Sequence, residues 1–437
     1  MTAGIIATVV SLEQVCLGGD SYFLGAVFAP MKIVTALMAL ILLRPGMRFW
    51  ASSWPVLLVL ALAMTWLAQP MVAPRLIAAH TATMLVPDLA LNGICRMLGD
   101  VGLLLAAAWL AFSRNGMRQV IDLLIAGGVL CILIGAVMQQ IEPGQVWGEI
   151  KIIQASRFSG TMANSNAAAC LFAMLALLAC ARAEERWRAL AQTGGASGEW
   201  VIVHLTVMAA GLAAGACALA QSRTAFIALL FGLPLVLIPS TSRRERYWMG
   251  CILFVASLCT MLAWLALAGG LSGRFVSFQT DFHTRQAMWQ HYLALARAAA
   301  WTGYGPLGFD AANARSWYDL HQAISFSYIH SPHNLLLSIM LIGGLPYLAL
   351  LTMALGLIGR TALRARLPCV CATLFRPLAA SLLVLGACSF TDIGADFPVV
   401  ASLGSVVLGL LWGQGINSQL DPSGAISRHY IERMHQG

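Results

Sequence analysis

The chain has 437 residues, of which 59% are hydrophobic and only 10% are charged. Soluble globular proteins carry roughly 25% charged residues, so this composition excludes an ordinary soluble domain and indicates a polytopic membrane protein. The net charge of +8 could suggest a nucleic-acid partner, but the basic residues stand mainly in short stretches between apolar runs. We therefore interpret them as topology determinants in contact with membrane lipids, and expect no nucleic acid.

Twelve apolar runs divide the chain. We predict spans one to twelve at residues 3–17, 22–43, 54–68, 93–112, 120–139, 162–181, 200–220, 224–238, 247–269, 334–358, 378–390 and 399–412. The predicted fold is an all-α bundle of about twelve transmembrane helices. It comprises helices one to nine (1–269), a large loop with an amphipathic helix (270–333), helices ten to twelve (334–415) and a tail (416–437).

Arginine clusters follow every second predicted span. By the positive-inside rule, both termini and these five loops lie in the cytoplasm. The clusters are Arg44 and Arg48; Arg114 and Arg118; Arg182, Arg186 and Arg188; Arg243, Arg244 and Arg246; Arg360, Arg364 and Arg366. The arginines left on the predicted outer side are Arg75, Arg157, Arg223, Arg274, Arg285, Arg297 and Arg315. Topology gives no reason for these residues, so we expect them to bind an anion.

Three of the outer arginines have informative neighbours. Arg223 opens predicted span eight, and a guanidinium at a helix N-terminus suits an anion, although lipid phosphate is an alternative ligand. Arg285 lies one helical turn before Trp289. Arg157 precedes the pair Asn164–Asn166, which favours a polar helix start.

The segment 270–333 is long for a loop in a compact membrane bundle and is rich in aromatic residues. Apolar residues recur at helical spacing between Asp281 and Ala300, which predicts an amphipathic helix at the membrane interface. A tight turn should follow at Gly303, Gly305, Pro306 and Gly308. The aromatic residues are either interface anchors or a wall for a lipid-linked sugar, with Trp289 and Tyr304 as candidate sugar contacts.

Two histidines precede predicted span ten, His330 and His333, and Asn334 follows the second. A neutral imidazole could take a proton from a sugar hydroxyl, although an interfacial histidine is often only hydrogen-bonded. The intervening Pro332 spoils the helical spacing for a metal ion shared by the two histidines, and no carboxylate lies close in sequence. We expect neither a metal nor a cofactor.

Two aspartates stand in the last predicted outer loop, Asp392 and Asp396. They could orient a histidine or pair with an outer arginine, and the sequence leaves both alternatives open. The Gly343–Gly344 pair in span ten indicates close helix packing, which would fix the position of the imidazole.

Several of these motifs together resemble a known family. His333, Asn334, Gly344 and Tyr347 have the order and spacing of the signature near the large periplasmic loop of bacterial O-antigen ligases. The SRTA sequence at Arg223, the step from Arg285 to Trp289 and the GYGPLGF turn also look like that family, whose wider superfamily includes O-antigen polymerases and pilin oligosaccharyltransferases.

The resemblance implies a bundle related to the GT-C glycosyltransferases in the bacterial inner membrane, with a metal-independent site on the periplasmic face. The donor would be a glycan on undecaprenyl pyrophosphate, and the acceptor would be the outer core sugar of lipid A-core. Arg223 and Arg285 would hold the pyrophosphate and His333 would be the base. Arg157, Trp289, Tyr304, His330 and Asn334 are the further candidates for substrate binding.

Two alternatives stay open. An O-antigen polymerase would use the same kind of donor but another lipid-linked repeat as acceptor. A transporter or flippase also fits twelve spans and predicts charged residues inside them, for which Lys32, Arg96 and Asp100 are the main candidates.

Overall fold

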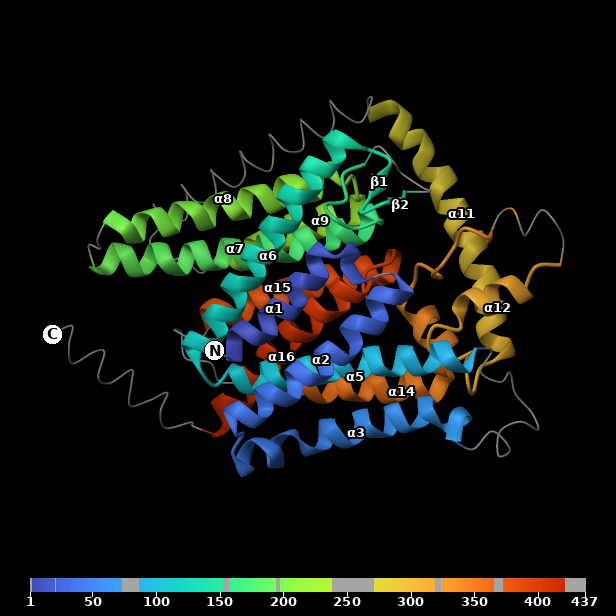
Figure 1. Cartoon of the computed structure of the whole chain (residues 1–437), viewed down its shortest axis with the longest axis horizontal. Coiled ribbons are helices and arrows are strands. Elements are labelled where there is room, and N and C mark those ends of the chain that lie inside the picture. Colours follow the sequence, from blue (N-terminus) through green and yellow to red (C-terminus); the bar gives the residue numbers. More distant parts are fainter. Residues whose placement is uncertain are drawn as a thin grey trace.

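The computed structural model, drawn in Figure 1, describes residues 2–19, 21–72, 86–151, 157–193, 197–237, 271–318, 324, 326–364 and 372–420. Predicted span nine, Arg75, Arg366, the arginine cluster at 243–246 and the tail beyond residue 420 lie outside the described residues. Within the described ranges, nine helices are long and apolar enough to cross a membrane. The prediction of an all-α polytopic membrane protein is confirmed, while its relation to the GT-C bundle stays a prediction.

The helices reproduce the predicted order. The nine long ones are α2 (Tyr22–Leu43), α3 (Met47–Val72), α5 (Pro87–Leu110), α6 (Arg114–Ile141), α7 (Ser165–Thr193), α8 (Ser197–Leu219), α14 (Leu335–Leu363), α15 (Ala372–Thr391) and α16 (Pro398–Leu420). Two shorter apolar helices, α1 (Thr2–Val15) and α9 (Arg223–Leu237), coincide with predicted spans one and eight. α16 continues to Leu420, past the predicted boundary at residue 415.

The remaining elements are short or lie outside the apolar runs. They are the 3-10 helix η1 (Leu17–Gly19), the strands β1 (Gln145–Val146) and β2 (Glu149–Ile150), α11 (Leu271–Ala298) and α12 (Phe309–Arg315). The two strands form an antiparallel hairpin between α6 and α7.

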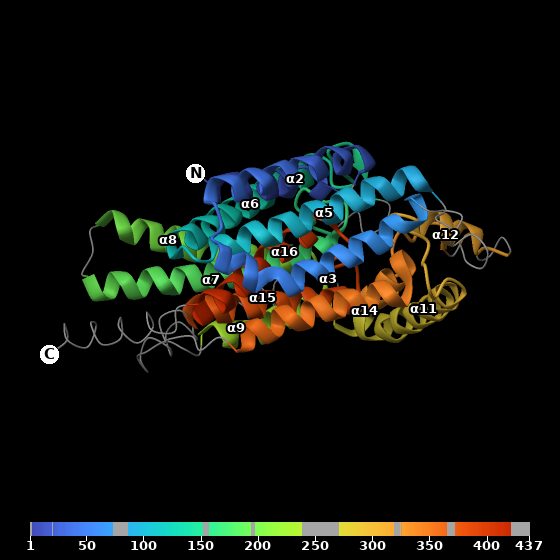
Figure 2. The ribbon, with the colours of Figure 1, turned by 90° about the horizontal axis from the view of Figure 1, so that it is seen from below.

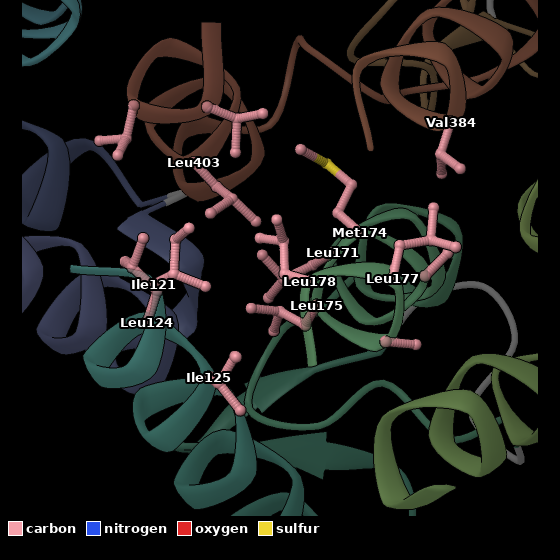
Figure 3. Close-up of a cluster of buried hydrophobic side chains, with 14 of the residues drawn as sticks. Ile121, Leu124, Ile125, Leu171, Met174, Leu175, Leu177, Leu178, Val384 and Leu403 are labelled. Carbon is pink, nitrogen blue, oxygen red and sulfur yellow. The ribbon is translucent and has the colours of Figure 1, made fainter. Parts of the chain in front are cut away.

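α7 is the centre of the bundle. Every residue from Ala167 to Glu185 is buried, and α8, α9 and α15 all pack against this helix. Its many alanines let neighbouring backbones approach closely, which is how helices associate where lipid removes the hydrophobic driving force. Figure 3 shows the apolar core that α6, α7, α15 and α16 share, with Ile121, Leu124, Ile125, Leu171, Met174, Leu175, Leu177, Leu178, Val384 and Leu403.

The two ends of the bundle differ. α11 and α12 lie at one end (Figures 1 and 2), which we call the site end, where α7 and α14 begin and α15 ends. The described arginine clusters lie at the opposite end, because the helices they follow run away from the site end. Some of these arginines form ion pairs there, and Asp122 accepts from Arg182 Nε (2.8 Å) and from Arg186 Nη2 (2.7 Å).

Charged groups inside the bundle also pair with one another. Lys32 Nζ of α2 lies 3.1 Å from a Glu13 carboxylate oxygen of α1 and 2.9 Å from Asp100 Oδ1 of α5. Ser402 of α16 accepts a hydrogen bond from Lys32 Nζ at 2.8 Å. These contacts join four helices, and buried charges are tolerated when they are paired in this way.

α11 is the helix predicted in the large loop, and it begins earlier than expected, at Leu271. It crosses the site end at a steep angle to the bundle axis (Figure 1). Its buried residues Met288, Tyr292 and Ala296 recur every four positions. This face packs against Ile329, Leu337 and Leu341. The apolar face is therefore used for protein packing, and its location at a membrane interface stays a prediction.

α14 is interrupted at Gly344, whose backbone (φ 70°, ψ −169°) is accessible almost only to glycine. The glycine-rich turn after α11 fits into this break. The N–H groups of Tyr304 and Gly305 donate to α14 carbonyls just before the break, at 2.6 and 3.0 Å. Leu345 N–H donates to the Ala300 carbonyl at 2.7 Å. The predicted turn and the predicted close packing are both confirmed, but backbone meets backbone at a helix break, not along two continuous helices.

Candidate active site

Asp392, directly after α15, is the centre of a buried polar cluster at the site end. Its Oδ1 lies 2.9 Å from His333 Nδ1 and accepts from the Ile393 N–H, also at 2.9 Å. Its Oδ2 accepts from Arg285 Nη2 at 2.8 Å and from Asn166 Nδ2 at 2.9 Å. A single carboxylate thus joins four elements: the starts of α7 and α14, the end of α15 and one side of α11.

The surroundings of Asp392 keep this carboxylate charged. Burial alone would raise its pKa, but the hydrogen bond from His333 and the positive charge of Arg285 oppose burial, and the pKa lies below its usual range. At neutral pH the group therefore acts only as a hydrogen-bond acceptor.

This acceptor fixes the protonation pattern of His333. Because a carboxylate only accepts, Nδ1 carries the proton in the bond to Asp392. In the neutral imidazole, Nε2 then has the free lone pair. The His333 side chain is 23% exposed, so a substrate group can reach it. A histidine oriented by a carboxylate in this way is suited to act as a general base.

The backbone of His333 is unusual. Its φ of 52° lies in the left-handed region, which costs a residue with a side chain roughly 1–2 kcal/mol. Asn334 follows as the N-cap of α14, and its Oδ1 accepts from the first N–H groups of that helix at 3.1 and 3.2 Å. Its Nδ2 donates to the Phe390 carbonyl at 3.1 Å. Asn334 thus ties the start of α14 to the end of α15, and its role in substrate binding stays a prediction.

The structure decides between the alternatives that the sequence left open for the two aspartates. Asp392 both orients His333 and pairs with Arg285. Asp396 instead accepts hydrogen bonds from the hydroxyls of Ser331 and Ser338.

Arg285 is anchored by two of its five N–H groups. Nη1 donates to the Thr391 carbonyl at 2.8 Å, and Nη2 donates to Asp392 at 2.8 Å. The side chain is still 36% exposed. The guanidinium is therefore oriented by the protein, while the side chain as a whole remains partly exposed.

Arg223 is the first residue of α9, as predicted. Its neighbour Thr224 accepts a hydrogen bond from Thr391 Oγ1 at 3.1 Å. Since the Thr391 carbonyl is also the acceptor for Arg285, the start of α9 lies beside the turn that holds Arg285. The helix that begins with Arg223 and the helix that carries Arg285 thus both contact this turn.

The segment that begins with Arg157 contributes a residue that the sequence did not single out. Asn164 Oδ1 accepts from the N–H groups at the start of α7 (2.9 and 3.0 Å), which is the predicted polar helix start. Asn166, however, reaches Asp392. The backbone carbonyl of Arg157 accepts a hydrogen bond from Lys151 Nζ at 3.2 Å. The pairing of two asparagines beside an outer arginine was the signal that could have pointed to Asn166.

The two aromatic candidates are placed differently. Trp289 is partly buried against the α11–α14 cluster, and its Nε1 is buried with no hydrogen-bond partner among the described residues. Tyr304 anchors the glycine-rich turn, because its hydroxyl donates to the Leu295 carbonyl at 3.1 Å. Burial raises the pKa of the Tyr304 phenol. A sugar contact for either residue stays a prediction.

His330 lies apart from the cluster. Its Nδ1 is 3.1 Å from Asp310 Oδ1, and both side chains are well exposed. Of the two histidines, only His333 therefore contacts the buried carboxylate. Within the described ranges, no group of three His, Cys, Asp or Glu side chains could hold a metal ion.

Comparison with protein families gives a match between residues 208–352 and the family model described as O-antigen ligase. The match spans residues 208–352 of the 437-residue chain and supports its similarity to the O-antigen ligase superfamily. The matched segment contains Arg223, Arg285 and His333, so the resemblance of these motifs is confirmed. Members of this superfamily are glycosyltransferase-like ligases and polymerases. Asn166 and Asp392 lie outside the match and join the site through the fold. A comparison with curated protein sequences found no match.

Proposed function

We propose that the protein is an O-antigen ligase, which transfers a glycan from undecaprenyl pyrophosphate to the outer core sugar of lipid A-core. One observation carries the proposal. His333 is hydrogen-bonded to a buried carboxylate that also binds Arg285. A base is thereby linked to a cation whose fork suits a phosphate leaving group.

In the proposed reaction, the acceptor hydroxyl gives its proton to Nε2 of His333 while its oxygen attacks the anomeric carbon of the donor. The new C–O bond forms as the bond from that carbon to the pyrophosphate oxygen breaks, and the configuration inverts. Asp392 stabilises the imidazolium, which later releases the proton to water. General-base catalysis of this kind contributes about 10²–10⁴-fold to the rate.

The leaving pyrophosphate needs fixed positive charge. Arg285 and Arg223 would supply it in this mechanism, and the anchoring of Arg285 to the α15–α16 turn supports pre-organisation of its remaining N–H groups. The arginines would take the place that a metal ion has in other phosphate-leaving reactions, so the transfer is metal-independent. Arg157, Tyr304, His330 and Asn334 would supply further substrate contacts.

Trp289 would serve the same donor. Its side chain is only partly buried against the α11–α14 cluster, and the accessible part supports stacking on a sugar ring. It lies one helical turn from Arg285, so both groups would face the same part of the lipid-linked glycan.

The arginine-rich end opposite the site supports a location in the bacterial inner membrane with the site facing the periplasm. A lipid-linked donor and a lipid A-core acceptor would both reach the site from that leaflet. A deletion strain tests the function. Full-length polymer left on its lipid carrier would support a ligase, and lipid A-core capped with single repeats would support a polymerase. Unchanged lipopolysaccharide would contradict both.

A further inference from the structure

Asp396 lies in the same turn as Asp392 but contacts a different part of the chain. Its Oδ2 accepts hydrogen bonds from the hydroxyls of Ser331 and Ser338, the second at 2.9 Å. Both serines are buried. Ser331 precedes His333 in the sequence and Ser338 follows it. One carboxylate oxygen of Asp396 therefore joins the two segments that flank the candidate base.

Ser331 carries this link to His333. Its Oγ donates to Asp396 and accepts from the His333 N–H at 3.3 Å. A hydroxyl has one proton and two lone pairs. Because the Ser331 proton points to Asp396, a lone pair of the same oxygen is available to accept from the His333 N–H.

That N–H belongs to a residue in the left-handed region, with φ 52°. Residues with a side chain rarely adopt this conformation and keep it only where the surroundings enforce it. The conformation brings the His333 side chain to Asp392. Relaxation of the backbone would therefore move the imidazole away from its carboxylate.

We infer that Asp396 is a positioning residue, which acts through Ser331 and Ser338 to hold the backbone of His333 so that its imidazole meets Asp392. The inference rests on the proposed function of His333. The two aspartates of the turn thus have separate tasks: Asp392 binds the side chain of the base, and Asp396 holds its backbone. Displacement of a catalytic group by about 1 Å can cost about 10²-fold in rate.

The task requires a hydrogen-bond acceptor and not a charge. Both hydroxyls donate to the same oxygen of Asp396. In Asp396→Asn, an amide oxygen at that position can accept both bonds, whereas Asp396→Ala removes both. Ser331→Ala removes the link to the His333 N–H. Ser338→Ala removes only the second anchor of Asp396.

The test uses the full chain in lipid vesicles with an undecaprenyl-pyrophosphate-linked glycan as donor and purified lipid A-core as acceptor. Asp396→Ala and Ser331→Ala should each lower kcat by about 10–100-fold, with the donor KM within about 3-fold of wild type. Asp396→Asn should keep kcat within about 3-fold of wild type. The kcat of Ser338→Ala should lie between those of Asp396→Asn and Asp396→Ala. The Asp396→Ala/Ser331→Ala double variant should be no slower than the slower single variant, because both changes break one linkage.

His333→Ala is assayed alongside, so that two failures can be told apart. If it is inactive while Asp396→Ala and Ser331→Ala keep the wild-type kcat, the positioning role is overturned and the proposed function stands. If His333→Ala is fully active, the proposed function itself fails. An equal loss of kcat in Asp396→Asn and Asp396→Ala would overturn the claim that Asp396 acts as a hydrogen-bond acceptor and not through its charge. If Asp396→Ala does not fold, Ser331→Ala decides, and a wild-type kcat in that variant overturns the role.

Discussion

His333 and Asp392 are 59 residues apart in the chain, and 2.9 Å separates their bonded side-chain atoms. The contact forms because α14 begins where α15 ends, at the same end of the bundle. The same carboxylate binds Arg285 and Asn166. A candidate base and a candidate phosphate ligand are therefore parts of one hydrogen-bonded network.

Replacement of the shared carboxylate should disable this network. Asp392→Asn keeps the size of the side chain but directs an amide N–H₂ at groups that are all donors. We expect kcat for glycan transfer to fall by about 10²-fold, with little change in protein yield. Asp310→Asn, at the exposed partner of His330, is the control and should stay within about 3-fold of wild type. A wild-type rate for Asp392→Asn would contradict the assignment.

The charge of Asp392 also predicts a pH dependence of stability. Its pKa is lower in the folded protein than its ordinary value, so its ionised form stabilises the fold. This contribution is complete above the ordinary value of about 3.9 and is lost as the pH falls through the lowered folded value. The difference in melting temperature between wild type and Asp392→Asn in detergent should still be present at about pH 5 and should shrink below about pH 4. A difference that grows in acid would have the wrong sign.

The anchoring of Arg285 predicts that lysine cannot replace it. A lysine ammonium has no planar fork, so it cannot bind Thr391 and Asp392 and also present aligned donors to a phosphate. Arg285→Lys should lower kcat/KM for the lipid-linked donor by about 10–100-fold. The control is Arg360→Lys, an exposed position in the last turn of α14 at the opposite end of the bundle, which should stay within about 3-fold. Equal rates for the two variants would exclude a specific role for the fork.

The break in α14 predicts that alanine substitution has very different effects on stability at two glycines of that helix. A Cβ at Gly344 would lie 2.4 Å from the Trp301 backbone and would sit on a backbone with φ 70°. Gly344→Ala should therefore destabilise the protein by more than about 2 kcal/mol. Gly356→Ala, with no atom within 4 Å of the added Cβ, should be neutral or stabilising by up to about 1 kcal/mol. Thermal unfolding in detergent measures both, and similar melting temperatures would contradict the packing at the break.

Much of the helical order followed from the sequence, because long apolar runs have few structural alternatives in a membrane protein. α2 has the predicted bounds of residues 22 and 43. α14 begins one residue after its predicted start, where Asn334 caps the helix. The helix in the large loop was expected from its apolar periodicity, although α11 begins earlier.

The partners within the site could not be predicted in the same way. Hydropathy and spacing describe local structure, and they do not report which residues distant in sequence meet. Asp392 was a candidate partner without an assigned residue, and Asn166, 226 residues away from it, was interpreted only as part of a helix start. The choice between His330 and His333 was likewise decided by tertiary contacts, since one faces an exposed aspartate and the other a buried one.

The most direct test of the central claim compares these two histidines in purified protein reconstituted in vesicles, with an undecaprenyl-pyrophosphate-linked glycan and lipid A-core. His333→Ala should slow glycan transfer by at least about 10²-fold. His330→Ala should slow it by less than about 10-fold. Transfer at the wild-type rate by His333→Ala, or abolition of transfer by His330→Ala alone, would contradict the assignment of His333 as the base.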